Sequence, residues 1–240
     1  MNIMCDGIRI NKFLSEAGVC SRRQADILIE NSEVTIDGKI ASPGDRVFIT
    51  SKVLYKGKPV KGGIRPVIYA YNKPIGLVCT SIDADSQSIF SKTTFPVKVN
   101  YVGRLDKDSS GLLLLTNDGI LSNSIQKSKN NHEKEYMVRV NRDITEEFIE
   151  RMSGGIPILD TVTKKCIVTK TGQRSFKIVL TQGLNRQIRR MCEYCGYRVI
   201  NLKRVRVMNI KLGNLRPGEY RELTGQEEAD LRAMIRGEKK

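Results

Sequence analysis

The chain has 240 residues and a formal net charge of +15, with 40% hydrophobic and 28% charged residues. This length has room for one large domain or for a large and a small one, and the composition is ordinary for a soluble globular protein. The positive charge favours a polyanionic partner but does not distinguish nucleic acid from an anionic membrane. The opening MNIMCDGIRI has no apolar run, and six cysteines at irregular spacing are typical of reduced thiols. We therefore expect a cytoplasmic protein that neither crosses a membrane nor is secreted.

Residues 7–55 have the pattern of a small α+β module. RINKFLSEAG (9–18) predicts a short helix, and SRRQ (21–24) has the form of a capping box that opens a second helix. VTIDGKI (34–40) contains the dipeptide Asp-Gly between two β-rich runs, which predicts a hairpin. A further turn and strand are expected in PGDRVFIT (43–50).

The charge of this module is balanced, because residues 1–55 contain seven Lys or Arg and seven Asp or Glu. If the module binds RNA, it must do so through a local patch, for which the candidates are Arg9, Lys12, Arg22 and Arg23. Residues 56–66, KGKPVKGGIRP, carry four positive and no negative charges among Gly and Pro. This composition predicts a flexible basic linker.

Residues 67–240 alternate strand-like and helix-like segments without a regular βαβ rhythm. That order favours an α+β domain built on a mainly antiparallel, mixed sheet. Residues 184–211 hold eight Lys or Arg against one Glu, close to half of the net charge of the whole chain. Such a concentration indicates a surface that binds phosphates.

The segment GRLDKDSSGLLLLT places Asp106 in a Gly/Ser-rich loop directly before a strand of four leucines. A carboxylate at the edge of a core must be paired, hydrated or used in chemistry. Two interpretations stay open on this pattern: Asp106 is half of a buried ion pair with an arginine, or it is a catalyst. Asp108 is expected to point elsewhere if the loop is extended, which argues against a paired-carboxylate glycosidase.

GLNRQIRRMCEYCGY predicts a helix with one apolar face formed by Ile188, Met191, Cys192 and Cys195. Arg189 lies at the margin of this face and is the arginine expected to reach a partly dry interior, whereas Arg186 and Arg190 point away. Both sulfurs of CEYC lie on the packing face and no second Cys pair or His cluster exists, so we predict inert thiols and no metal site.

The run KEYMVRV (134–140) predicts a strand with Lys134, Tyr136 and Val138 on one face. Tyr136 is either a core tyrosine with its hydroxyl satisfied or an aromatic plane on which an extruded base stacks. His132 is the only histidine, and its polar surroundings predict a loop residue that is at most a helper.

Taken together, these motifs resemble a known family. GRLDKDSSGLLLLT is similar to the catalytic motif of pseudouridine synthases, KEY and GLNRQIRRM are similar to two further motifs of that superfamily, and residues 7–50 resemble the S4 RNA-binding domain. The whole chain resembles the branch that includes ribosomal small subunit pseudouridine synthase A. NHEKEYMV and GIPILDTVTKKC bring it closest to the ribosomal large subunit pseudouridine synthase F group. Ser109 stands where the family usually has threonine, which keeps the hydroxyl and loses a methyl group.

The resemblance implies isomerisation of a uridine to pseudouridine in RNA, most simply in 23S ribosomal RNA, without a metal or redox cofactor and by a monomer. It implies that Asp106 is the nucleophile or base, that Arg189 pairs with it, and that Tyr136 lies against the target base. Further RNA contacts are expected from Arg104, Lys134, Asn185, Arg186, Gln187, Arg190, Lys203 and Arg204, in addition to the patch of the first module.

Three alternatives remain at the level of sequence. One is a non-catalytic, S4-containing, ribosome-associated RNA-binding protein, which the long second domain argues against. Another is an aminoacyl-tRNA synthetase with an S4 domain, although no HIGH-like or KMSKS-like motif is present. The third is a pseudouridine synthase directed at tRNA or at small subunit rRNA.

Overall fold

The structure is a computed structural model that describes residues 7–48, 50–60, 65–80, 86–126 and 132–237. The chain forms two compact units, Met1–Pro66 and Val67–Lys240. Both mix helices and strands, so the α+β class predicted from the sequence is confirmed. Among the described residues, no helix has the length and apolar character needed to cross a membrane.

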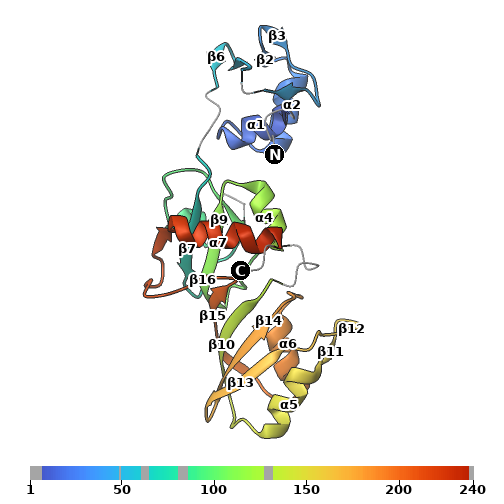
Figure 1. Cartoon of the computed structure of the whole chain (residues 1–240), viewed down its shortest axis with the longest axis vertical. Coiled ribbons are helices and arrows are strands. Elements are labelled where there is room, and N and C mark those ends of the chain that lie inside the picture. The colour runs from blue at the N-terminus through green and yellow to red at the C-terminus, as the bar shows by residue number, and fades with distance from the viewer. Residues whose placement is uncertain (1–6, 49, 61–64, 81–85, 127–131, 238–240) are drawn as a thin grey trace. The chain divides into compact units, whose positions relative to one another are not determined.

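The N-terminal unit contains two helices and two small sheets (Figure 1). Its elements are β1 (Ile8–Arg9), α1 (Ile10–Glu16), α2 (Arg22–Glu30), β2 (Val34–Ile36), β3 (Lys39–Ile40), β4 (Arg46–Val47), β5 (Val53–Tyr55) and β6 (Lys58–Pro59). The predicted capping box is present, because the Ser21 side chain accepts from the Gln24 backbone while the Gln24 side chain accepts from the Ser21 backbone. Eight buried side chains, among them Ile10, Leu14 and Val34, form its core.

The range 56–66 is not a linker throughout. Lys56 and Gly57, both with positive φ, form a tight turn, and β6 pairs back with β5 through Leu54↔Pro59 and Tyr55↔Lys58. A two-residue turn with positive φ at both positions matches the twist of the two strands in a hairpin. The strands therefore pair here although the segment is basic. Residues 61–64 lie outside the described residues.

The C-terminal unit is built on a mixed sheet with the strand order β13-β14-β10-β15-β9-β7-β17, with β16 paired to β15 and β8 to β9. The strands are β7 (Ile68–Lys73), β8 (Asn100–Val102), β9 (Ser110–Thr116), β10 (Lys134–Val140), β13 (Ile167–Gly172), β14 (Ser175–Leu180), β15 (Val199–Val207), β16 (Ile210–Lys211) and β17 (Tyr220–Glu222). A separate hairpin pairs β11 (Pro157–Ile158) with β12 (Thr161–Val162).

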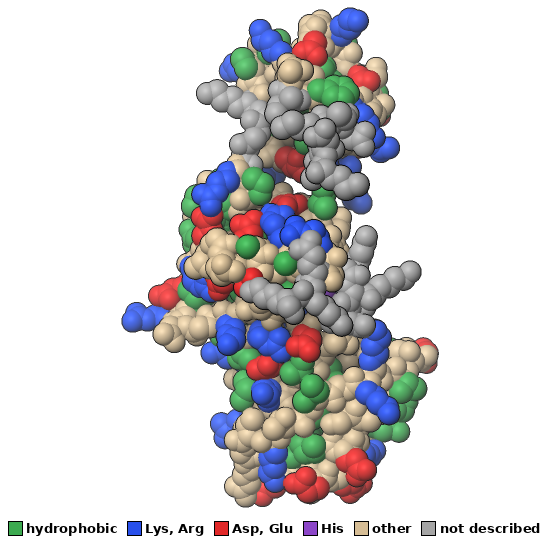
Figure 2. Space-filling view, viewed as in Figure 1, with side chains coloured by type: hydrophobic (Ala, Val, Ile, Leu, Met, Phe, Trp, Pro, Cys, Tyr) green, Lys and Arg blue, Asp and Glu red, His purple; other side chains and the backbone are tan. Residues whose placement is uncertain are grey.

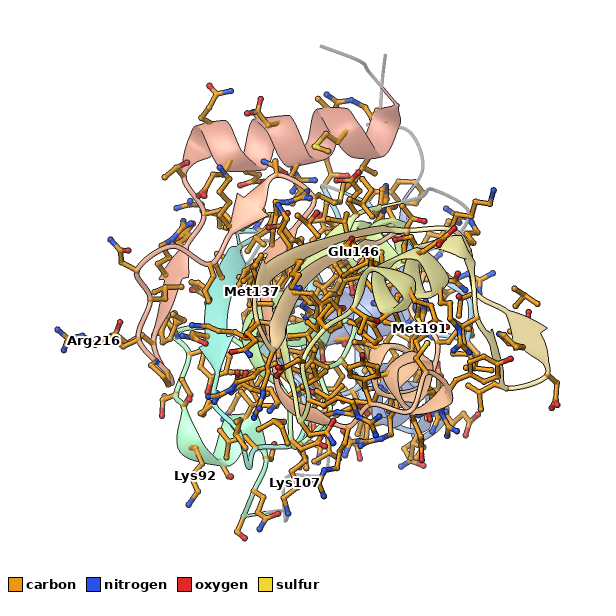
Figure 3. The ribbon with its side chains drawn as sticks, turned by 90° about the horizontal axis from the view of Figure 1, so that it is seen from below. Lys92, Lys107, Met137, Glu146, Met191 and Arg216 are labelled. Carbon is orange, nitrogen blue, oxygen red and sulfur yellow. The ribbon has the colours of Figure 1, made fainter. Side chains whose placement is uncertain are left out.

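Helices cover the two ends of this sheet separately (Figure 1). They are α3 (Ile89–Lys92), α4 (Gly119–Gln126), α5 (Glu146–Gly154), α6 (Gln187–Tyr194) and α7 (Gly225–Arg236). α5 and α6 pack on β10, β13 and β14 through Phe148, Met191 and Phe176, whereas α4 and α7 pack on β7 and β9 through Leu121 and Leu231. In Figure 3, Met191 lies among packed side chains, while Lys92 and Lys107 lie at the periphery.

The two ends of the sheet meet where β15 runs parallel to β9, at Lys203↔Ser110 and Arg204↔Gly111. Gly111 has φ +104°, and a Cβ there would lie 2.2 Å from the Arg204 carbonyl oxygen. Only glycine allows so close an approach of two backbones at this φ. Gly111 therefore sets the distance between the two strands at the point where the loop carrying Asp106 enters the sheet.

Candidate active site

The Asp106 loop is anchored by hydrogen bonds from a buried lysine. Lys73, at the end of β7, is fully buried, and its Nζ donates to the carbonyl oxygens of Pro74 and Ser109, both at 2.8 Å. Leu105 and Ser109 are buried on either side of the exposed part of the loop. The loop is thus anchored at both ends, and the Asp106 side chain keeps 35% of its surface exposed.

Two arginines of α6 contact this loop, and their pairing differs from the sequence-based expectation. Arg186 Nη1 lies 3.7 Å from Asp106 Oδ2, and Arg186 Nη2 lies 3.2 Å from Asp108 Oδ2. Arg189 Nη2 instead donates to the Asp108 carbonyl oxygen at 2.9 Å and to Ser109 Oγ at 3.2 Å, and it lies 3.3 Å from Asp108 Oδ2.

The expected direct pair of Asp106 with Arg189 is therefore wrong in this structure, and Asp108 does not point elsewhere. The physical reason is the backbone at the start of α6. Arg186 adopts the left-handed conformation, with φ 50° and ψ 35°, and this turns its side chain back toward the loop. A helical projection extended to Arg186 could not predict this, because the residue precedes the regular helix. Non-glycine residues in this region are often found at functional sites.

The two arginines also change the acidity of the loop. Burial opposes ionisation of Asp108, but the hydrogen bond from Arg186 and the charges of Arg189 and Arg186 outweigh it and lower the pKa of Asp108. The pKa of Arg186 is correspondingly raised, first by its hydrogen bond to Asp108. Asp108 thus serves as the anion that both guanidinium groups contact, and Arg186 also lies beside Asp106.

Strands β10 and β15 supply the opposite wall of the site. Tyr136 on β10 is paired with Arg204 on β15, and Lys134 lies two residues before Tyr136 on the same strand. Tyr136 is half-buried and contacts the cores at both ends of the sheet. The strand predicted for residues 134–140 is confirmed at both of its bounds.

A cavity of about 610 Å³ opens between these walls. Both ring and sugar of a nucleotide fit in a volume of this size. Its lining includes Asp106, Tyr136, Leu180, Leu184 and Ile188, together with the predicted RNA-binding residues Arg104, Lys134, Asn185, Arg186, Gln187 and Arg204. Within the described parts of the C-terminal unit, a half-exposed carboxylate therefore faces a cavity surrounded by cations.

Not every predicted RNA-binding residue of the C-terminal unit lines the cavity. Arg190 and Lys203 do not line the cavity, since Arg190 turns back to Asn185 and Lys203 alternates with the inward-facing Leu202 and Arg204 along β15. Gln187 lines it but is buried, and its Oε1 accepts from the Leu184 backbone at 3.0 Å, so part of its amide is used within the loop.

The predicted patch Arg9, Lys12, Arg22 and Arg23 belongs to the N-terminal unit, where Arg9, Arg22 and Arg23 are exposed and Lys12 lies 3.6 Å from Glu16. On the face seen in Figure 2, Lys and Arg side chains are interspersed with Asp and Glu. Charge on that face therefore does not outline a binding surface by itself.

Sequence reasoning missed two residues of the site. Lys73 carries the loop, and Cys79 lines the cavity with its Sγ 3.5 Å from the Leu105 amide. A lysine before Pro74 at the end of an apolar strand was the available signal for Lys73, whereas nothing in the sequence places Cys79. His132, expected in a polar loop, is buried, with Nδ1 3.0 Å from the Ile125 carbonyl oxygen.

No group of three or more His, Cys, Asp or Glu side chains in the described parts of the chain is placed to hold a metal ion. Cys192 and Cys195 lie on the helix face that packs, and burial raises the pKa of both thiols. Thiols with a raised pKa are poor nucleophiles and poor ligands, which supports their assignment as packing residues.

A carboxylate that faces a cavity of nucleotide size among cations is the arrangement expected of an enzyme that acts on a nucleic acid. Residues 67–194 match the family model described as RNA pseudouridylate synthase, and residues 8–47 match the S4 domain. The chain belongs to the RNA pseudouridylate synthase family.

Similarity to individual proteins supports this assignment. The chain is 48% identical over 231 residues to the dual-specificity RNA pseudouridine synthase RluF of Salmonella typhi, covering 95% of this chain and 80% of that protein. It is 36% identical to an RNA pseudouridine synthase of Rickettsia typhi, covering 91% of this chain and 92% of that protein. A crystal structure of a pseudouridylate synthase superimposes with a TM-score of 0.67 at 27% identity, covering 95% of this chain and 99% of that one.

Proposed function

We propose that this enzyme converts one specific uridine of 23S ribosomal RNA to pseudouridine, acting as a monomer in the cytoplasm with Asp106 as its catalyst. The observation that carries the proposal is the position of the Asp106 carboxylate, which is 35% exposed, lies 3.7 Å from Arg186 Nη1 and lines a cavity of about 610 Å³. An ionised carboxylate in such a place acts as a nucleophile or a base.

The arginines have separate roles in this proposal. Arg186, whose Nη1 lies 3.7 Å from Asp106 Oδ2, holds the Asp106 carboxylate in place at the cavity. Arg189 is a positioning residue, since it holds Ser109 and the Asp108 backbone and through them the loop.

Tyr136 is the surface against which the extruded uracil stacks, worth about 1–3 kcal/mol. Extruding the nucleotide costs a few kcal/mol, which stacking and phosphate contacts offset. Arg104, Asn185 and Arg190 in the C-terminal unit, and the exposed arginines of the S4 domain, are the proposed contacts to the RNA backbone.

The choice of 23S RNA rests on the resemblance to the ribosomal large subunit pseudouridine synthase F group. The Salmonella relative is named a dual-specificity RNA pseudouridine synthase, which favours a second RNA substrate. We propose tRNA as that second substrate class.

The catalytic part is tested with Asp106→Asn and, as a matched control, Asp160→Asn. Asp160 is an exposed turn residue with φ 57°, a conformation that asparagine also adopts readily. We expect Asp106→Asn to abolish isomerisation while RNA affinity stays within a few fold, and Asp160→Asn to behave as the wild type. Equal activity of Asp106→Asn and wild type would eliminate the proposed catalyst.

The substrate is tested by mapping pseudouridines in rRNA and tRNA from cells that lack and then regain the protein. A single 23S site that is lost and restored supports the assignment. A change confined to tRNA would overturn it.

A further inference from the structure

Arg204 is a buried cation without a carboxylate partner. Its residue is 3% exposed, its Nε donates to the Leu112 carbonyl oxygen at 2.7 Å, and its Nη2 is buried with no hydrogen-bond partner. No Asp or Glu oxygen in the described part of the chain lies within the 4.0 Å of a salt bridge. Nevertheless Arg204 lines the cavity that contains Asp106.

Arg206, two residues further along β15, is also partly buried, but its charge is paired with carboxylates. Its Nη2 lies 3.0 Å from Glu133 Oε2 and 3.1 Å from Glu135 Oε2, so its charge is neutralised within the fold. A buried charge left unpaired costs several kcal/mol. Arg204 differs from Arg206 in that no carboxylate of the described residues neutralises its charge, which leaves the charge to act on a ligand in the cavity.

A second cation lies beside it. Lys134 also lines the cavity, and its Nζ makes one long hydrogen bond, 3.4 Å to the His132 carbonyl oxygen. Its pKa is lowered, first by burial and then by repulsion from the charge of Arg204. An electron-rich group placed between them would relieve this repulsion.

Arg204 is held in a fixed position. Arg204 pairs across the sheet with Tyr136, and Gly111 brings β9 against β15 so that the Leu112 carbonyl reaches Arg204 Nε. Side chains on central strands are positioned more rigidly than those on loops.

The neighbourhood favours a flat base over a phosphate as the ligand. Arg204 lies next to Tyr136, the proposed stacking surface, and it is almost inaccessible to water. The exposed Arg104 and Arg186, also in the lining of the cavity, are better suited to hydrated phosphates.

We propose that Arg204, assisted by Lys134, binds a ring carbonyl oxygen of the extruded uracil and stabilises the negative charge that the ring carries while it is detached. This deepens the proposed function and rests on it. When the bond between N1 and C1′ breaks, its electron pair stays on the ring and spreads over N1 and the carbonyl oxygens O2 and O4. The ring then forms the C5–C1′ bond, C5 loses its proton to a base, and N1 takes up a proton. The charge on oxygen is largest between these steps, so a fixed cation there lowers the barrier.

The first test compares Arg204→Met with Arg216→Met in single-turnover reactions on a 23S fragment that contains the target uridine. Arg216 is exposed and projects from the periphery in Figure 3. We expect Arg204→Met to slow isomerisation about 100-fold, as for loss of one donor to a developing oxyanion. RNA affinity should stay within a few fold of wild type, and Arg216→Met should match wild type in both respects. A wild-type rate in Arg204→Met would overturn the inference.

A second test separates a contact to the ring from a merely structural role. The target uridine is replaced by 2-thiouridine or 4-thiouridine, because sulfur is a weaker hydrogen-bond acceptor than oxygen. If Arg204 contacts one of these oxygens, one thio substitution slows the wild type but has a smaller effect on Arg204→Met, so the two changes are not additive. Additive effects at both positions would overturn the inference. Should Arg204→Met not fold, as judged by thermal melting, Lys134→Met carries the same cycle with the same criterion.

Different results would overturn the proposed function and the role of Arg204. A wild-type protein that forms no pseudouridine overturns the proposed function. An active wild type with additive thio effects overturns the role of Arg204 alone.

Discussion

Replacing Gly111 with alanine tests how tightly the two halves of the catalytic unit are joined at the site. The new Cβ would lie 2.2 Å from the Arg204 carbonyl oxygen and 2.7 Å from its amide nitrogen, whereas ordinary contacts begin at 3.4 Å. The φ of +104° adds strain of about 1–3 kcal/mol, and separating the strands weakens hydrogen bonds worth about 0.5–1.5 kcal/mol each. We expect a total destabilisation of about 4 kcal/mol, which corresponds to a fall in Tm of about 8–16 °C.

The assay measures thermal unfolding of the full chain by calorimetry, and Gly213→Ala is the control. Gly213 has φ +59°, but a Cβ there would meet nothing within 4 Å, so only the conformational cost of about 1 kcal/mol remains. We therefore expect a fall in Tm of about 2–4 °C for the control. Equal falls in the two variants would refute the reasoning that contact with Arg204, and not φ alone, requires glycine at 111.

Two further predictions concern stability. Lys73→Met should lower the free energy of unfolding by about 2–4 kcal/mol and also lower kcat, because the Pro74 and Ser109 carbonyl oxygens lose a buried donor. The control is Lys92→Met, which changes an exposed lysine at the periphery. An unchanged kcat in Lys73→Met would contradict the role of Lys73 in holding the loop. The hydrogen bonds of Glu227 to Arg221, opposed by burial and supported by the Thr224 amide, lower the pKa of Glu227 from 4.5 to about 2. Its folded-state pKa is depressed, so its contribution is present above pH 4.5 and is lost as pH falls toward 2. Urea titrations of wild type and Glu227→Gln should therefore differ above pH 4.5 and converge gradually as the pH falls toward 2. A difference that stays constant over this range would exclude the linkage.

Much of the local structure could be predicted from the sequence because it depends on neighbours in the chain. The capping box at Ser21 and the strand 134–140 both appear as expected. Residues 56–60 show the limit of such reasoning, since their basic composition indicated a linker while the turn at Lys56 and Gly57 made a hairpin.

The sequence predicted which residues belong to the site but not how they contact one another. Asp106, Tyr136 and Arg189 were expected together; Asp106 and Tyr136 line one cavity, whereas Arg189 contacts the loop at Ser109. Which arginine meets which carboxylate was not predictable, because the left-handed backbone of Arg186 redirects its side chain from the helix surface to the loop.

By itself the sequence determined the α+β class, the secondary structure of most segments and the family of the enzyme, because periodicity, caps and motifs are local properties. Tertiary structure alone decided that Lys73 would anchor the loop, that Asp108 would hold both arginines and that Arg204 would lie buried without a partner. Each of these depends on segments that are distant in the chain: Lys73 of β7 lies beside β9, Asp108 meets the start of α6, and Arg204 of β15 lies against β9 at Gly111. Contacts between such distant segments are set by packing, and no local pattern encodes them.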